Sequence, residues 1–169
     1  MSVLKKNTKI LMIIFILLAF CLNLNLVHAA SGTSSSQGNG NDETSLYKSG
    51  KQLVIRAKKL EKKNKIEKAQ KLYLKALSKF EKAYKKDKKN ADLLNYFGYA
   101  LRKTGDFEKA EVFYLKGLEL DAGHLGINEY LGELYVQTDR IELAKERLQV
   151  LKGCKCEEYD ELKELIEKN

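Results

Sequence analysis

The chain has 169 residues without proline or tryptophan, and it carries 31 Lys and Arg against 23 Asp and Glu, a formal net charge of +8. This length suits one domain, with a surface that is basic on average. Of two histidines, His28 falls in a predicted leader, so the mature chain keeps only His124. A single histidine argues against a Ser-His-Asp triad, a Cys-His pair or a multi-histidine metal site, and we expect no enzymatic activity, metal or cofactor.

Residues 1–29 have the layout of a secretory signal peptide. Three lysines precede an uninterrupted apolar run over residues 10–22, and small side chains follow at Val27 and Ala29. This run is shorter than the ~20 apolar residues that a spanning helix needs, so an uncleaved membrane anchor is the weaker alternative. We expect cleavage after Ala29 and export of the chain to the periplasm.

The next stretch, residues 30–44, is rich in Ser, Gly, Asn and Thr and has no large apolar side chain. Such a segment cannot bury enough surface to offset the entropy lost on ordering, so we expect a flexible linker. The folded domain is then expected over residues 45–169.

Charge is distributed unevenly along this domain. Residues 46–90 hold 17 Lys and Arg against 4 Asp and Glu, whereas residues 91–169 hold 11 against 17. The simplest explanation is a solvated, lysine-rich helix surface. A basic first unit would also attract an anionic membrane surface or an acidic partner, and both stay open as alternatives. Nucleic acid is not expected, because an exported chain rarely meets it.

One sequence pattern occurs three times in the domain: NKIEKAQKLYLKAL at 64–77, GDFEKAEVFYLKGL at 105–118 and DRIELAKERLQVL at 139–151. Its alanine falls at positions 69, 110 and 144, which gives spacings of 41 and 34. In the middle copy Gly105 permits a sharp turn, Asp106 can cap a helix, and apolar side chains then recur at helical spacing. We therefore expect a helix to begin at each copy.

The helices that precede these copies also match each other, with Gly98 and Gly132 in the same place 34 residues apart. Glycine inside a helix costs about 1 kcal/mol relative to alanine, so its repeated use indicates that a neighbouring helix packs too closely for a side chain. Asn90 and Asp139 are expected to cap further helices. The second helix of the first unit has about seven extra residues, two turns that we expect to project past the stack.

These residues resemble the tetratricopeptide repeat family, whose 34-residue units are helix pairs with small and aromatic residues at fixed positions. The resemblance implies an all-α helical solenoid of three helix pairs, with units at about 50–90, 91–124 and 125–156 and a capping helix at 157–168. The proline that usually closes each unit is absent, and Ala122 and Cys156 stand in its place. The family's packing roles fall on Ala57, Ala69, Gly98, Ala110, Gly132 and Ala144.

In such a solenoid the first helices of the units line a concave groove. Tyr99 and Arg102 are an aromatic residue and an arginine among polar neighbours, which is the composition of a binding hot spot. An equally good interpretation is that Tyr99 only forms the floor of the groove. The resemblance implies an adaptor that binds a protein or peptide and aids assembly of an envelope complex. A membrane-surface tether through the lysine-rich first unit is the alternative function. The implied lining positions are Lys51, Val54, Lys58, Asn95, Tyr99, Arg102, Glu129, Glu133 and Val136.

Cys154 and Cys156 give the mature chain an even number of cysteines, which favours a disulfide in an oxidising compartment. Free thiols packed between the third unit and the cap are one alternative, and redox exchange or soft-metal binding is another. His124 could add a metal ligand only if the stack brings its loop to the two cysteines.

Overall fold

The structure is a computed structural model that describes residues 39–169. The predicted signal peptide at 1–29 and the first part of the predicted linker lie outside the described residues. Export and cleavage after Ala29 therefore stay predictions. None of the helices in the described part is both long enough and apolar enough to cross a membrane.

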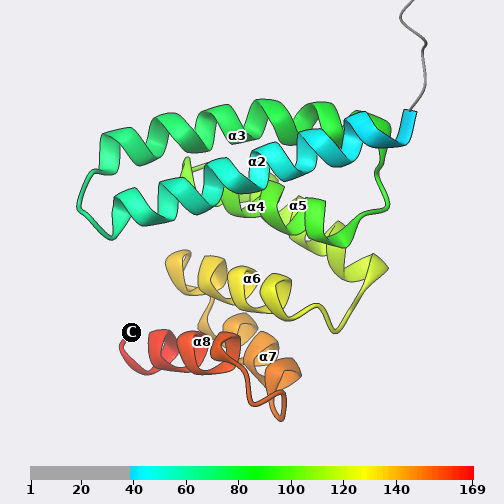
Figure 1. The fold of residues 1–169 in the computed structure, drawn as a ribbon. Coiled ribbons are helices and arrows are strands. Elements are labelled where there is room, and N and C mark those ends of the chain that lie inside the picture. The colour runs from blue at the N-terminus through cyan, green and yellow to red at the C-terminus, as the bar shows by residue number, and fades with distance from the viewer. Residues whose placement is uncertain (1–38) are drawn as a thin grey trace, which may run out of the picture. The chain divides into compact units, whose positions relative to one another are not determined.

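Residues 39–169 form seven helices and no strand. Six of the helices make three antiparallel pairs, and the seventh follows the third pair, which confirms the predicted all-α solenoid of three helix pairs with a capping helix (Figure 1). The helices are α2 (Asn39–Glu61), α3 (Ile66–Lys86), α4 (Ala91–Lys103), α5 (Phe107–Leu120), α6 (Leu125–Gln137), α7 (Ile141–Leu151) and α8 (Glu157–Glu167).

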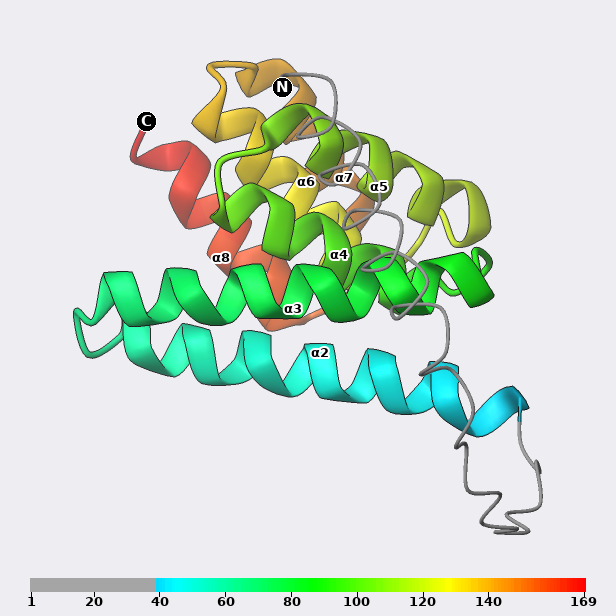
Figure 2. The same cartoon turned by 90° about the horizontal axis from the view of Figure 1, so that it is seen from above.

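The three pairs stack on one another in chain order (Figure 2). α4 packs against both α2 and α6, and α8 packs against α6 and α7. The first helices of the pairs thus form one row, and α8 continues this row as its fourth member. Stacked repeats need such a closing helix, because the last pair otherwise leaves its apolar face in water. Leu162 of α8 is fully buried and provides that cover.

The folded part begins earlier than the sequence predicts. α2 starts at Asn39, so residues 39–44, which were expected to belong to the flexible linker, are helical. Once a helix has nucleated, each further residue adds a hydrogen bond for a small loss of entropy. Polar residues can therefore extend an existing helix even though they have no apolar surface of their own to bury.

A residue with left-handed backbone closes the turn inside each helix pair. Asn64, Gly105 and Asp139, the first residues of the three sequence copies, have φ angles of 53°, 89° and 57°. Glycine, asparagine and aspartate tolerate this region best, which explains why three different residues open the copies. The prediction of Asp139 as a helix cap is therefore wrong. The residue before α7 is Arg140, whose side chain makes no capping hydrogen bond.

The other two predicted helix caps are confirmed. Asn90 Oδ1 accepts a hydrogen bond from the backbone N–H of Leu93 at 2.9 Å, at the start of α4. Asp106 Oδ1 accepts one from the backbone N–H of Lys109 at 3.3 Å, at the start of α5. Each side chain satisfies a backbone donor that the first turn of a helix otherwise leaves without a partner.

We expect Asn90→Ala to lower the free energy of unfolding by about 1 kcal/mol, because the first turn of α4 loses its side-chain acceptor. Lys65→Ala is the matched control, since Lys65 precedes α3 without a side-chain capping hydrogen bond. Urea denaturation measures both variants. Equal losses would show that the Asn90 hydrogen bond contributes nothing to stability.

Small residues stand where helices approach one another most closely. A Cβ on Gly98 would lie 2.7 Å from the ring of Tyr114, and a Cβ on Gly132 would lie 2.5 Å from Leu162. Glycine at these two positions therefore lets α4 meet α5 and α6 meet α8. Four alanines of the repeats are fully buried in the same layers, namely Ala57, Ala69, Ala110 and Ala144.

The extra length of α3 is part of the core. α3 has 21 residues against 14 in α5, but its added turns do not simply project past the stack as expected. Phe80 and Ala83 in these turns are fully buried. The Phe80 ring lies where a Cβ on Gly50 of α2 would come within 2.4 Å, and it is 6.1 Å from the ring of Phe97 in α4. The extension is covered because α2 is long as well.

Candidate functional site

Three clefts lie along the row formed by α2, α4, α6 and α8, and we call this row the groove. The first cleft, of about 430 Å³, lies where α4 and α6 begin. The second, of about 150 Å³, lies between the end of α2 and the start of α8, and the third, of about 320 Å³, lies between the ends of α6 and α8. Glu129 and Tyr130 line both the first and the second cleft, so these two clefts share a floor.

A cluster of two tyrosines and one lysine forms the centre of the groove. The rings of Tyr99 and Tyr130 have their centroids 4.7 Å apart. Lys58 Nζ lies 5.4 Å from the Tyr99 centroid and 5.5 Å from the Tyr130 centroid, and it donates a hydrogen bond to the Tyr130 hydroxyl at 3.3 Å. Aromatic faces carry partial negative charge, so both rings hold the ammonium. The cluster thereby ties α2, α4 and α6 together.

Arg102 makes a second tie between α4 and α6. Its Nη2 lies 2.5 Å from Glu133 Oε2, and its Nη1 donates a hydrogen bond to Gln137 Oε1 at 3.1 Å. The guanidinium carbon also lies 5.3 Å from the centroid of the Tyr99 ring. Arg102 is only 4% exposed, and a cation so buried is tolerated only when it is paired in this way.

Tyr99 and Arg102 keep fixed protonation states. Burial raises the pKa of the Tyr99 hydroxyl to about 12. Burial alone would lower the pKa of Arg102, but its interactions with Tyr114 and Glu133 outweigh this effect and raise the pKa overall. Neither group titrates near neutral pH, so neither is poised for acid or base catalysis.

Glu129 is a buried carboxyl in the groove, and its pKa is raised. It is only 3% exposed, and oxygen atoms of Glu129, Glu133 and Glu161 all lie within 4.8 Å of one another. Burial, a hydrogen bond with Glu161 and the charge of Glu133 raise the pKa of Glu129 to about 9. This carboxyl is therefore uncharged at pH 7. The three carboxyls are also the only group of three or more potential metal ligands among residues 39–169.

The sequence matches the profile of the tetratricopeptide repeat family over residues 79–112, from the last turns of α3 through α4 into α5. This part of the chain is a tetratricopeptide repeat. A search of curated proteins gives no significant match.

Solved tetratricopeptide repeat structures resemble this protein at low sequence identity. A tetratricopeptide repeat protein from Parabacteroides merdae is 17% identical with a TM-score of 0.52, over 72% of this chain and 60% of that protein. The tetratricopeptide repeat domain of Arabidopsis OM64 is 16% identical with a TM-score of 0.54, over 78% and 99%. The second such domain of human RPAP3 is 20% identical with a TM-score of 0.51, over 75% and 99%. These likenesses show the shared fold.

The fold buries most of the positions that the resemblance assigned to the groove. Val54 and Val136 are 1% and 6% exposed and belong to the apolar core, so they offer no contact to a ligand. Tyr99 and Arg102 are enclosed by the ring and ion-pair contacts described above. Asn95 and Glu129 are buried yet line the first cleft, and the partly exposed positions are Lys51, Lys58 and Glu133.

No sequence pattern predicted that Tyr130, Lys62 and the acidic residues at the start of α8 belong to the site. Lys62 follows Lys58 by four residues, so helical spacing could have placed it on the same side as Lys58, although α2 ends one residue before it. Nothing in the sequence except its position beside Glu129 indicated that Tyr130 belongs to the site. The acidic residues of α8 that line the second cleft are Glu157, Glu158 and Glu161, and the sequence showed them only as part of a capping helix.

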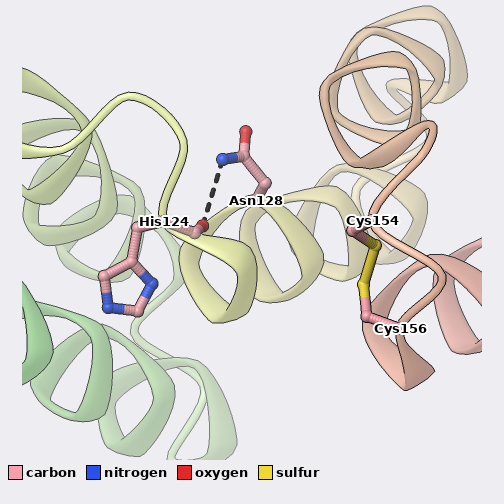
Figure 3. The surroundings of a disulfide bond; sticks show 4 residues. All are labelled: His124, Asn128, Cys154 and Cys156. Atoms are coloured by element: carbon pink, nitrogen blue, oxygen red, sulfur yellow. Dashed lines mark hydrogen bonds between the residues drawn. A yellow bond between two sulfur atoms is a disulfide. The ribbon is translucent and has the colours of Figure 1, made fainter.

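A disulfide joins Cys154 and Cys156 in the loop between α7 and α8, with their Cα atoms 5.2 Å apart. Figure 3 shows His124 at the start of α6, pointing away from this bond. His124 Nδ1 accepts a hydrogen bond from the backbone N–H of Ile127 at 3.2 Å, and its Nε2 faces Asp92 Oδ1 at 3.4 Å. The histidine is therefore a helix cap, and within the described residues it shares no group of metal ligands with the cysteines.

Proposed function

We propose that this tetratricopeptide repeat protein is an exported adaptor that binds an extended segment of another protein in its groove and thereby aids assembly of an envelope complex. The leader-like sequence of residues 1–29 supports export. The charges that line the groove support binding. We propose a binding role and not a catalytic one, because solved structures of the same fold carry bound peptides.

Two walls of opposite charge face each other across the second cleft. This observation is the main support for the proposal that the groove binds a peptide segment. Lys58 of α2 and Lys62, in the turn that follows α2, form one wall, and the α8 glutamates form the other. In the described part of the chain no ion pair within 4.0 Å joins the two walls. Charges held apart in this way can pair with the charged groups of a ligand.

The size of the second cleft favours an extended segment over a helix. The cleft holds about 150 Å³. An α-helix with its side chains is about 10–12 Å in diameter, which is too wide for such a space. A single extended strand of polypeptide with alternating side chains fits better, and its backbone can follow the row of helices from one cleft to the next.

Structures of the same fold give further support. The second tetratricopeptide repeat domain of human RPAP3 was solved in complex with an HSP70 peptide. The first such domain of Spaghetti (RPAP3), 18% identical to this chain with a TM-score of 0.50, was solved bound to an HSP90 peptide. A peptide segment is accordingly the ligand class that we propose for this groove.

Lys62→Glu is expected to lower recovery of the partner from an envelope extract by about tenfold, because the reversed charge repels what the α2 wall attracts. Lys71→Glu on α3 is the matched control, since both lysines are exposed and the change in net charge is the same. Affinity capture with quantitative mass spectrometry measures recovery. Equal recovery with both variants and the unaltered protein would overturn the groove proposal.

A membrane-surface tether is the second candidate function, and the exposed face of α3 favours it. Each lysine near an anionic surface adds about 1 kcal/mol of attraction, which weakens as ionic strength rises. If this function holds, Lys71→Glu and not Lys62→Glu weakens binding to anionic vesicles, and added salt abolishes that binding. The exposed lysines of this face include Lys68, Lys71, Lys75, Lys82 and Lys85.

A further inference from the structure

The first cleft is acidic and holds no lysine or arginine. Its carboxyl groups are those of Asp92, Asp121, Glu129 and Glu158. Its histidine, His124, is already engaged, because Nδ1 accepts a hydrogen bond from a backbone N–H and Nε2 faces Asp92. A volume of about 430 Å³ is in the range of sites that bind organic groups. Walls of this kind attract a positively charged group.

A buried acceptor without a partner lies in the wall of this cleft. Asn95 is 5% exposed, and its Oδ1 has no hydrogen-bond partner. Its amide lies against another lining residue, Gly126, where a Cβ would come within 2.8 Å of Nδ2. The terminal torsion of asparagine is soft, so the oxygen can turn toward a donor that enters the cleft. An ammonium or a guanidinium supplies such a donor together with a charge.

Two aromatic side chains complete the lining. Tyr96 and Tyr130 border the cleft, and each ring already attracts an ammonium of α2. Lys51 Nζ lies 4.9 Å from the Tyr96 centroid, and Lys58 Nζ lies 5.5 Å from the Tyr130 centroid. Neither lysine lines the first cleft. The rings therefore suit contact with a further cation that enters from the cleft.

We propose that the first cleft binds the cationic end of a lysine or arginine side chain that the partner segment presents. This inference rests on the proposed function, because Glu129 and Tyr130 connect the first cleft to the second. A segment that lies across the charged walls of the second cleft can place its next basic side chain beside Asn95. A bare metal ion fits less well, since Glu133, one of the three clustered carboxyls, is paired with Arg102 and does not line the cleft.

Glu129 gives the binding event a measurable signature. Its carboxyl is uncharged at neutral pH because its pKa is raised to about 9. A cation in the cleft stabilises the carboxylate, so the carboxyl loses its proton to the solvent as the cation binds. Calorimetry in two buffers of different ionisation enthalpy detects this proton, and an uncharged ligand should release none.

The test uses N-acetyl-L-lysinamide as the probe, titrated into the ¹⁵N-labelled full-length protein with a chelator present. N-acetyl-L-norleucinamide is the uncharged analogue. We expect saturable shifts of the Asn95 side-chain amide and of Gly126, with binding at least about tenfold weaker for the norleucine probe. Glu158→Gln should weaken binding of the lysine probe by about fivefold. Glu119→Gln is the matched control, because Glu119 is exposed on α5 and lines none of the three clefts.

Two outcomes overturn the inference. Equal binding of the two probes, or no saturable shift with either probe, shows that the cleft does not select a cation. Saturation of the same resonances by calcium chloride alone, without binding of the lysine probe, assigns the cleft to a metal ion instead. If the lysine probe fails while Lys62→Glu still lowers recovery of the partner, the proposed function stands and only the cleft assignment falls.

Discussion

Tyr114→Ala is expected to lower the free energy of unfolding by about 3–5 kcal/mol. Tyr114 is fully buried in α5, and its ring fills the space where α4 carries Gly98. Truncation removes the contacts of the ring and leaves a cavity that neither helix can fill without moving. Urea denaturation followed by the circular dichroism of the helices measures the loss.

Tyr114→Phe is the matched control for this prediction. The Tyr114 hydroxyl is buried without a hydrogen-bond partner, although it lies close enough to Arg102 to influence its pKa. Removing an unpaired buried hydroxyl costs little and can even stabilise, so we expect a change within about 0.5 kcal/mol. A loss as large as that of Tyr114→Ala would mean that the hydroxyl, and not the ring, holds α4 and α5 together.

Gly98→Ala probes the same contact from the other helix. In the unaltered protein the added methyl group meets the Tyr114 ring, so the variant should be destabilised despite the better helix propensity of alanine. In the Tyr114→Ala background the ring is gone, and Gly98→Ala should raise stability by about 1 kcal/mol through that propensity. The change of sign between the two backgrounds identifies the ring as the obstacle.

Local chemistry explains why the fold could be predicted from the sequence. The spacing of Ala69, Ala110 and Ala144 indicates a repeating unit, because each alanine is fully buried at the same position of its sequence copy. The same holds for Gly98 and Gly132, whose missing side chains have no local cause within a helix. Such signals depend only on where two helices touch, and a repeat protein places every such contact close in sequence.

The errors in the fold prediction have a common physical cause. The conformation of a short segment depends on the helices packed against it as well as on its own sequence. Residues 39–44 look disordered alone but continue a helix that is nucleated elsewhere. The extra turns of α3 look like a projection until the equal length of α2 covers Phe80. Asp139 suits a helix cap and a left-handed turn equally well, and the geometry of the α6–α7 turn selects the second role.

The candidate site was harder to predict because side-chain pairing closes part of the groove. Tyr99 was expected either to meet a ligand or to form the floor of the groove, and it packs against Lys58 of α2 and Tyr130 of α6. Arg102 was expected to meet a ligand but pairs with Glu133 of α6. No sequence spacing reveals that Lys58 of α2 would reach Tyr130, which lies 72 residues away. The charged walls that remain open come from α2 and α8, the two ends of the solenoid, whose approach depends on the curvature of the whole stack.

Glu129 weakens the unliganded fold at neutral pH. Its pKa is raised from 4.5 to about 9 in the folded protein. Between these values the folded state holds more protons than the unfolded state, so stability falls as pH rises through this window and levels off above it. A charge-free side chain of the same shape removes this dependence, because it has no proton to lose.

Glu129→Gln is therefore expected to raise the free energy of unfolding by about 4–5 kcal/mol at pH 8 and by about 1 kcal/mol at pH 5, since each pKa unit between the folded and unfolded states corresponds to about 1.4 kcal/mol. Glu133→Gln, one helical turn away, should act in the opposite direction by about 1–3 kcal/mol, because it takes the carboxylate from the buried Arg102. Urea denaturation at pH 5, 6.5 and 8 measures both variants. If Glu129→Gln shifts stability equally at all three values, Glu129 is ionised throughout, and the cleft holds a carboxylate that releases no proton when a cation binds.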